Sequence, residues 1–144
     1  MDFLKNNLDM LIFGILGLMS FLMLWVTIER WLYFRRVDLK KFSHPDELNI
    51  GLTHNLTLLY SVGANAPYIG LLGTVLGILI TFHDLGQGGT ADVNTIMLGL
   101  ALALKATATG LFVAIPAILF YNGLLRKADV LTAIWRKEHG HEAL

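Results

Sequence analysis

Three long runs of apolar residues, at about 8–28, 66–82 and 96–121, limit what this chain can fold into. The hydrocarbon core of a bilayer is about 30 Å thick, and about 20 apolar residues cross it as an α-helix. Of the 144 residues, 55% are hydrophobic and 15% are charged, a balance that leaves little polar surface for a water-soluble domain. The sequence therefore predicts an all-α membrane protein with three transmembrane helices in one domain over residues 1–144.

Most basic residues outside these runs lie on one side of them, and Lys5 is the only contrary charge. The connection at 83–95 contains no Lys or Arg, whereas the segments 29–65 and 122–144 are rich in both. Because basic loops stay on the inner side of a membrane, the N-terminus and residues 83–95 are predicted outside and the two basic segments inside. The inner basic residues are Arg30, Arg35, Arg36, Lys40, Lys41, Arg126, Lys127, Arg136 and Lys137.

Local signals add detail to the inner and outer segments. Pro45, followed by Asp46 and Glu47, predicts the start of a short cytoplasmic helix that leads into the second run, where Pro67 kinks or restarts the helix. Asp92 or Asn94 is expected to cap the third transmembrane helix. The third transmembrane helix is expected to continue as a second helical extension on the inner side.

Several classes of function find no support in the sequence. The chain has no cysteine, its formal net charge is zero, and it contains no Walker loop, HExxH or GxSxG pattern. We therefore expect no enzyme activity, no metal or other cofactor and no nucleic-acid partner. His139 and His141 are expected to belong to a solvated terminus.

Small residues and hydroxyls share one face on each of the second and third runs. Such a face either packs helices closely or lines a polar path, because small residues let backbones approach and hydroxyls bond within their own helix. Thr74 and Thr107 both lie near the bilayer midplane at about 1.5 Å per residue, which favours a shared proton path. The two faces are Gly63, Pro67, Gly70, Thr74, Gly77 and Thr81, and Ala103, Thr107, Gly110, Ala114 and Ala117, with packing predicted at Gly70, Gly77, Gly110 and Pro116.

The third run also carries a full positive charge, Lys105. This residue lies two positions from Thr107 and therefore points about 200° around the helix, away from the threonine face. An ammonium at the centre of a membrane helix costs about 2.5–3.5 kcal/mol, and neither polar run has an acid in its apolar core to offset this. Lys105 either becomes neutral or reaches for the interface, or it contacts another subunit or water. We predict an intersubunit or partner contact.

Three sequence blocks resemble the MotA/TolQ/ExbB proton-channel family, and within it most closely the ExbB branch. The blocks are "ERWLYFRR" after the first run, "APYIGLLGTVLGILITF" in the second and "KATATGLFVAIPAILFYN" in the third, and they occur in the family's order. The resemblance covers all three runs. The inner segment and the C-terminal segment are short, which indicates a compact subtype.

The resemblance implies a ring-shaped oligomer, a homopentamer, in the bacterial inner membrane with a periplasmic N-terminus and a cytoplasmic C-terminus. The pore would hold an ExbD-like single-span partner whose carboxylate exchanges protons. Proton exchange at this carboxylate would produce a motion of the complex. The motion would be delivered to a TonB-like protein and so energise TonB-dependent outer-membrane transport. Thr74 and Thr107 match the pore-facing threonines of the family. One departure is Leu102, which stands where ExbB proteins often have a glutamate.

Two alternatives stay open at this point. A TolQ-like subunit would drive envelope maintenance instead of nutrient transport. A passive scaffold would use its small residues only to assemble a complex. The short inner segment argues against a MotA-like subunit.

Overall fold

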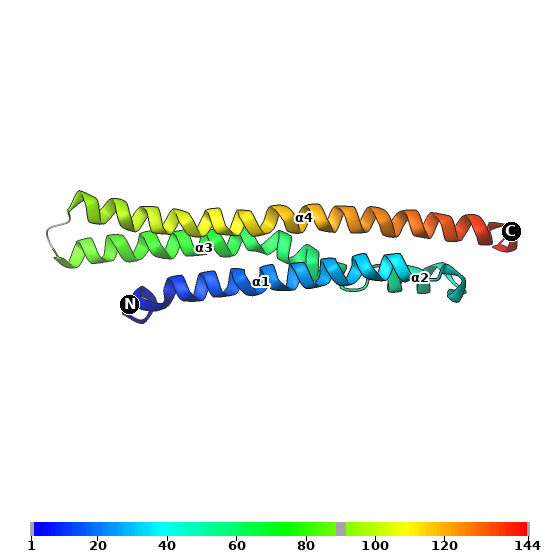
Figure 1. Ribbon diagram of the computed structural model, residues 1–144. Coiled ribbons are helices and arrows are strands. Elements are labelled where there is room, and N and C mark those ends of the chain that lie inside the picture. The colour runs from blue at the N-terminus through cyan, green and yellow to red at the C-terminus, as the bar shows by residue number, and fades with distance from the viewer. Residues whose placement is uncertain (1, 89–91, 144) are drawn as a thin grey trace.

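The computed structural model describes residues 2–88 and 92–143, and the side-chain surroundings of residues 7–88 and 92–140. Every element in this part of the chain is helical: α1 (Asp2–Arg36), a 3-10 turn η1 (Leu39–Lys41), α2 (Pro45–Leu52), α3 (Leu56–Gly88) and α4 (Val93–Ala143). In Figure 1, α3 and α1 lie side by side along α4, and α2 lies against its second half. The two ends of the chain lie toward opposite ends of this elongated bundle.

Three of the helices, α1, α3 and α4, have the length and apolar composition needed to cross a membrane. This finding confirms the prediction of an all-α chain with three membrane-spanning helices. Each helix also continues past its predicted apolar run, because backbone hydrogen bonds within a helix do not depend on a lipid environment. The long connection expected at 83–95 is correspondingly shortened, since α3 ends at Gly88 and α4 begins at Val93.

The start of α2 agrees with its sequence signals. Pro45 is the first residue, Asp46 and Glu47 lie in the first turn, and the His44 ring accepts a hydrogen bond from the Asp46 backbone N–H at 3.1 Å. Asp92 caps the start of α4, because its carboxylate accepts from the Asn94 N–H at 3.3 Å. This position confirms Asp92, rather than Asn94, as the cap.

The restart predicted at Pro67 is wrong. The break lies further toward the N-terminus, where Asn55 has a left-handed backbone with φ of 66° between α2 and α3. Asparagine tolerates this conformation better than most residues. Pro67 instead lies inside a continuous α3, where the single carbonyl freed by its missing N–H is tolerated within a membrane helix.

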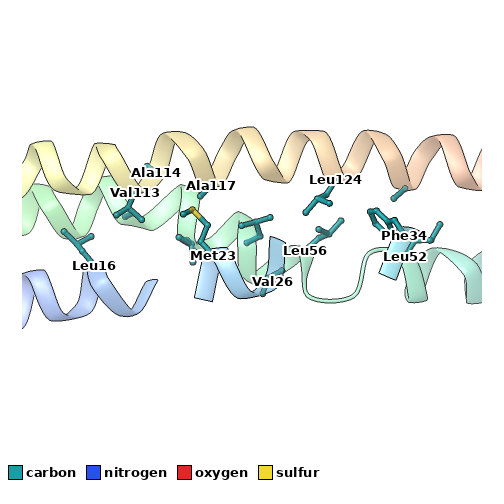
Figure 2. Packing of buried hydrophobic residues seen from close by; sticks show 14 of the residues in the cluster. Leu16, Met23, Val26, Phe34, Leu52, Leu56, Val113, Ala114, Ala117 and Leu124 are labelled. Carbon is teal, nitrogen blue, oxygen red and sulfur yellow. The ribbon is translucent and has the colours of Figure 1, made fainter. Parts of the chain in front are cut away.

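One continuous apolar core holds the helices together (Figure 2). Buried residues of α1 recur every three or four positions and face α3 and α4. Figure 2 shows Leu16 and Met23 of α1 in the same buried cluster as Val113 and Ala117 of α4. The core continues past the membrane runs to Leu52 and Trp135.

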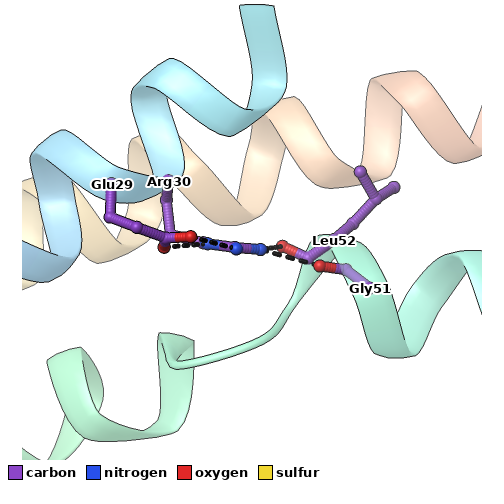
Figure 3. Close-up of polar contacts among 4 residues, drawn as sticks. All are labelled: Glu29, Arg30, Gly51 and Leu52. Atoms are coloured by element: carbon purple, nitrogen blue, oxygen red, sulfur yellow. Dashed lines mark hydrogen bonds and ion pairs between the residues drawn. The ribbon is translucent and has the colours of Figure 1, made fainter. Parts of the chain in front are cut away.

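A buried arginine fastens α1 to the end of α2. The Arg30 side chain is 3% exposed, and its Nη1 donates to the backbone oxygen of Gly51 at 2.7 Å (Figure 3). Nε and Nη2 each lie 2.5 Å from a carboxylate oxygen of Glu29. Since the last carbonyls of a helix have no partner within it, a cation there both satisfies them and complements the helix dipole.

Candidate functional site

The site begins with a close approach of two backbones. A Cβ built on Gly70 in α3 would lie 2.6 Å from the backbone oxygen of Ala106 in α4, and one on Gly110 would lie 2.6 Å from that of Ala66. Real Cβ atoms do not come so close to a backbone atom, so only glycine fits at both positions. The helices therefore touch through their backbones here, as small residues in membrane helices allow.

The other two residues predicted for helix packing, Gly77 and Pro116, differ in their contacts. A Cβ on Gly77 would lie 2.9 Å from the Ala103 Cβ, so Gly77 also lies at the contact between α3 and α4. Pro116 is half-buried between Ala114 and Ala117, and α4 continues through it. The structure thus brings three of the four together along one seam and leaves Pro116 outside the backbone contact.

Two hydroxyls meet in this seam. The Thr74 side chain is 8% exposed, and its Oγ1 lies in a short contact with Oγ1 of Thr107 from the facing helix. Thr74 Oγ1 also lies 2.7 Å from the backbone oxygen of Ala103, while Thr107 Oγ1 lies 3.5 Å from that of Gly70. The sequence placed the two threonines at one depth, and the structure brings them into direct contact.

Each hydroxyl has one hydrogen, which fixes how this cluster can be bonded. The shorter carbonyl contact assigns the Thr74 hydrogen to Ala103, so the hydrogen between the two hydroxyls comes from Thr107. In the reverse arrangement Thr74 donates to Thr107, and Thr107 is left with the longer contact to Gly70. The pair is therefore a short hydrogen-bonded chain that can point in either direction.

The pair lies toward one edge of the seam. Helix α1 covers the opposite edge, where Ile12 would lie 3.1 Å from a Cβ on Gly73. At 100° per residue, both threonines lean away from α1 toward an edge with no neighbouring helix among the described residues. We call this the open edge; it consists of the exposed residues Leu71, Val75, Leu104 and Leu111. Thr107 is half-buried there, so it is the member of the pair that a second molecule can reach.

Lys105 points elsewhere, as its position on the helix predicts. Its Nζ lies 6.0 Å from the centre of the Phe13 ring in α1, and the residue is exposed on the outer surface of the bundle with Leu102 and Phe112. Among residues 7–88 and 92–140, no carboxylate lies within salt-bridge distance of it. Within the described residues, the Phe13 ring is the neighbour recorded for the charge of Lys105.

Two groups that make buried hydrogen bonds in the structure were not predicted from the sequence: the Ala103 carbonyl and the Arg30 side chain. The Ala103 carbonyl accepts from Thr74, yet a backbone oxygen carries no sequence signal. Arg30 belongs to the "ERWLYFRR" block, where its basic charge was used only to orient the helices. Its position immediately after Glu29 at the end of an apolar run was the available signal for a buried, paired arginine.

Comparison with known proteins assigns the family. The sequence profile described as the MotA/TolQ/ExbB proton channel family matches residues 45–137, which include both threonines and the seam. The chain belongs to this family. The recognition made from the three sequence blocks is thereby confirmed, and the family is one of transport proteins rather than a known enzyme family.

Named relatives place the chain within the family more finely. It is similar to the biopolymer transport protein ExbB of Helicobacter pylori strain J99, with 55% identity over 94% of each chain. It is 47% identical to the protein of that name from Aquifex aeolicus, over 97% of this chain and 95% of the relative. The Tol-Pal system protein TolQ of Pseudomonas aeruginosa is 44% identical over 56% of this chain and 35% of its own length.

Proposed function

We propose that this chain is a motor subunit of the bacterial inner membrane that uses protons as its coupling ion to energise TonB-dependent outer-membrane transport. It would act with an ExbD-like single-span partner and deliver motion to a TonB-like protein. The similarity to proteins named ExbB over nearly the whole chain supports this choice. The N-terminus would lie in the periplasm and the C-terminus in the cytoplasm, in keeping with the distribution of basic residues.

The observation that carries the proposal is the hydroxyl pair of Thr74 and Thr107. It lies in the middle of two apolar helices, where polar groups are costly unless they are bonded or used. Thr107 is reachable from the open edge, whereas Thr74 is buried behind it. A carboxyl group of the partner helix at the open edge would therefore meet Thr107, and Thr74 would act through Thr107.

The two directions of the hydroxyl chain suit the two states of such a carboxyl group. When Thr107 donates to Thr74, its lone pairs face outward and accept a hydrogen bond from a protonated carboxyl group. When Thr74 donates to Thr107, the Thr107 hydrogen is held only by the distant Gly70 oxygen and is free for a carboxylate. The site would thus bind the partner before and after proton release by reversing two hydrogen bonds.

Assembly completes the proposal. Several copies, five in the arrangement implied by the resemblance, would form a ring with the open edges toward a central pore. Lys105 would then face a neighbouring subunit or the partner, which would supply an acceptor that the described residues of one chain do not place beside it. Burying its ammonium against a paired acceptor removes much of the 2.5–3.5 kcal/mol cost of leaving it in lipid.

The test replaces each hydroxyl at nearly constant volume. Thr107→Val and Thr74→Val should both abolish most proton-driven uptake in cells, because either change breaks the hydroxyl chain. Thr109→Val is the matched control, since its hydroxyl lies on the same helix but bonds only the Lys105 carbonyl, at 2.8 Å. Uptake of a TonB-dependent substrate and proton flux into vesicles should fall for the first two variants alone. Normal uptake in Thr107→Val would refute the proposed role.

A second candidate is TolQ-like envelope maintenance, which the similarity to the Pseudomonas aeruginosa TolQ supports over part of the chain. Expression in strains lacking either ExbB or TolQ separates the two functions, and we expect rescue of TonB-dependent growth. A passive scaffold is separated from both by proton flux. In vesicles that hold the chain and its partner, a scaffold would conduct no more protons than empty vesicles.

A further inference from the structure

A cavity of about 380 Å³ lies where α3 and α4 join, next to the first turns of α1. Its lining runs along α3 from Gly88 to Gly73, a length of about 22 Å at 1.5 Å per residue. On α4 the lining reaches inward to Ala103. The cavity therefore extends from the outer end of the bundle to the level of the hydroxyl pair, on the edge of the seam that faces α1.

The charged residues among the described lining of this cavity are all acidic. Asp9 of α1, Asp84 of α3 and Asp92 at the start of α4 all belong to the lining and all are exposed. None of the described lining residues is Lys, Arg or His. Three carboxylates from three separate helices make the outer end attractive to cations and unfavourable for an acyl chain.

The inner end of the cavity lies next to the hydroxyl pair. Gly73 and Ala103 belong to the lining, Gly73 precedes Thr74 in sequence, and the Ala103 carbonyl accepts the Thr74 hydrogen bond. Thr81 adds a hydroxyl along the wall, bonded to the Gly77 carbonyl at 2.9 Å. The cavity thus has carboxylates at its mouth, a hydroxyl along its wall and the backbone of the seam at its end.

We propose that this cavity is a water-filled, cation-selective vestibule that carries the outer aqueous phase to the level of Thr74 and Thr107. It would hold water and hydronium, and each protomer would have its own vestibule, separate from the open edge where the partner is proposed to bind. The inference rests on the proposed function, in which this end of the bundle faces the periplasm. Protons would then reach the depth of the hydroxyl pair through water rather than across lipid.

Thiol labelling tests this directly, because the chain has no cysteine and each single-cysteine variant carries one thiol. Ile80→Cys and Leu102→Cys place the thiol in the cavity wall. Leu79→Cys and Ala101→Cys are their sequence neighbours at matched depth, and both native residues are exposed outside the cavity. A membrane-impermeant methanethiosulfonate reagent is added from the periplasmic side to the full chain with its partner in native membranes. An uncoupler collapses the proton motive force, so that no proton flow is driven through the protein during labelling.

The expected result is labelling at least tenfold faster at the two cavity positions than at their neighbours. If exposure alone set the labelling rate, Leu79→Cys would be labelled faster than Ile80→Cys, because Leu79 is exposed and Ile80 is half-buried. Equal or slower labelling at both cavity positions would overturn the vestibule and would indicate that lipid or a neighbouring helix fills the space. Since labelling needs no proton flow, this outcome is independent of the threonine variants that test the function.

Charge selectivity gives a second measurement. The carboxylates at the mouth, although screened at physiological salt, should make a cationic reagent react about fivefold or more faster than an anionic one at Ile80→Cys. Combining Asp9→Asn, Asp84→Asn and Asp92→Asn should remove this preference while keeping the cap of α4, because Asn caps helices as well as Asp. An unchanged preference in the triple variant would overturn the role of the carboxylates.

Discussion

Gly70→Ala should separate α3 from α4 at the point where the hydroxyl pair forms. The new Cβ would lie 2.6 Å from the Ala106 oxygen, a backbone atom that cannot swing aside. Reaching an ordinary contact of about 3.4 Å requires the helices to move apart by about 0.8 Å. The same shift lengthens the 2.7 Å contact between Thr74 and the Ala103 oxygen to about 3.5 Å, beyond a good hydrogen bond.

The energetic cost follows from these two effects. Inserting a methyl group into a tight contact costs about 1–3 kcal/mol, and losing a hydrogen bond between membrane helices costs about 0.6 kcal/mol or somewhat more. Gly70→Ala should therefore lower the free energy of unfolding by about 2–4 kcal/mol, and it should also reduce proton flux because the hydroxyl chain is stretched.

Denaturant titration in mixed micelles measures the change in stability. The control is Gly123→Ala in α4, where a new Cβ would have no neighbour within 4 Å and the alanine should raise the free energy of unfolding by about 0.4–1 kcal/mol. Equal stability of the two variants would show that the seam is looser than a backbone contact and would remove the basis of this reasoning.

Two further changes address the charged residues. Arg30→Gln should lower the free energy of unfolding by about 2–4 kcal/mol in the same titration, because it leaves the α2 carbonyls and Glu29 without their cation; a loss below 0.5 kcal/mol would show that water replaces the guanidinium. Lys105→Met should insert normally but reduce the fraction of assembled oligomer in native mass spectra, and normal assembly together with normal uptake would exclude a role for the charge.

The sequence predicted features that depend on local chemistry and on helical period. Three apolar runs predicted the membrane helices, Asp92 and Pro45 marked helix starts, and a 3.6-residue period placed Thr74 and Thr107 on facing sides at one depth. These successes share a cause, because each depends on residues close together in the chain or on a simple count along a helix.

Features that depend on three-dimensional approach could not be predicted. The sequence predicted a helical extension after the third run, but hydropathy marks only where a chain is apolar and could not show how far α4 continues. Helical period gives the face of Thr74 but not its contact with the Ala103 carbonyl. The buried position of Arg30 depends on where α2 ends, which is set by the left-handed turn at Asn55.

The length of α4 has a mechanical consequence. At 51 residues it is about 76 Å long, more than twice the thickness of a bilayer core, and it carries both Thr107 and the buried Trp135 on one unbroken backbone. Trp135 Nε1 donates to the Phe42 oxygen at 3.1 Å, about 42 Å along the helix from the threonine. An α-helix resists twisting because successive turns are joined by backbone hydrogen bonds. A rotation of α4 at the level of the hydroxyl pair therefore exerts a torque on the contact between Trp135 and Phe42.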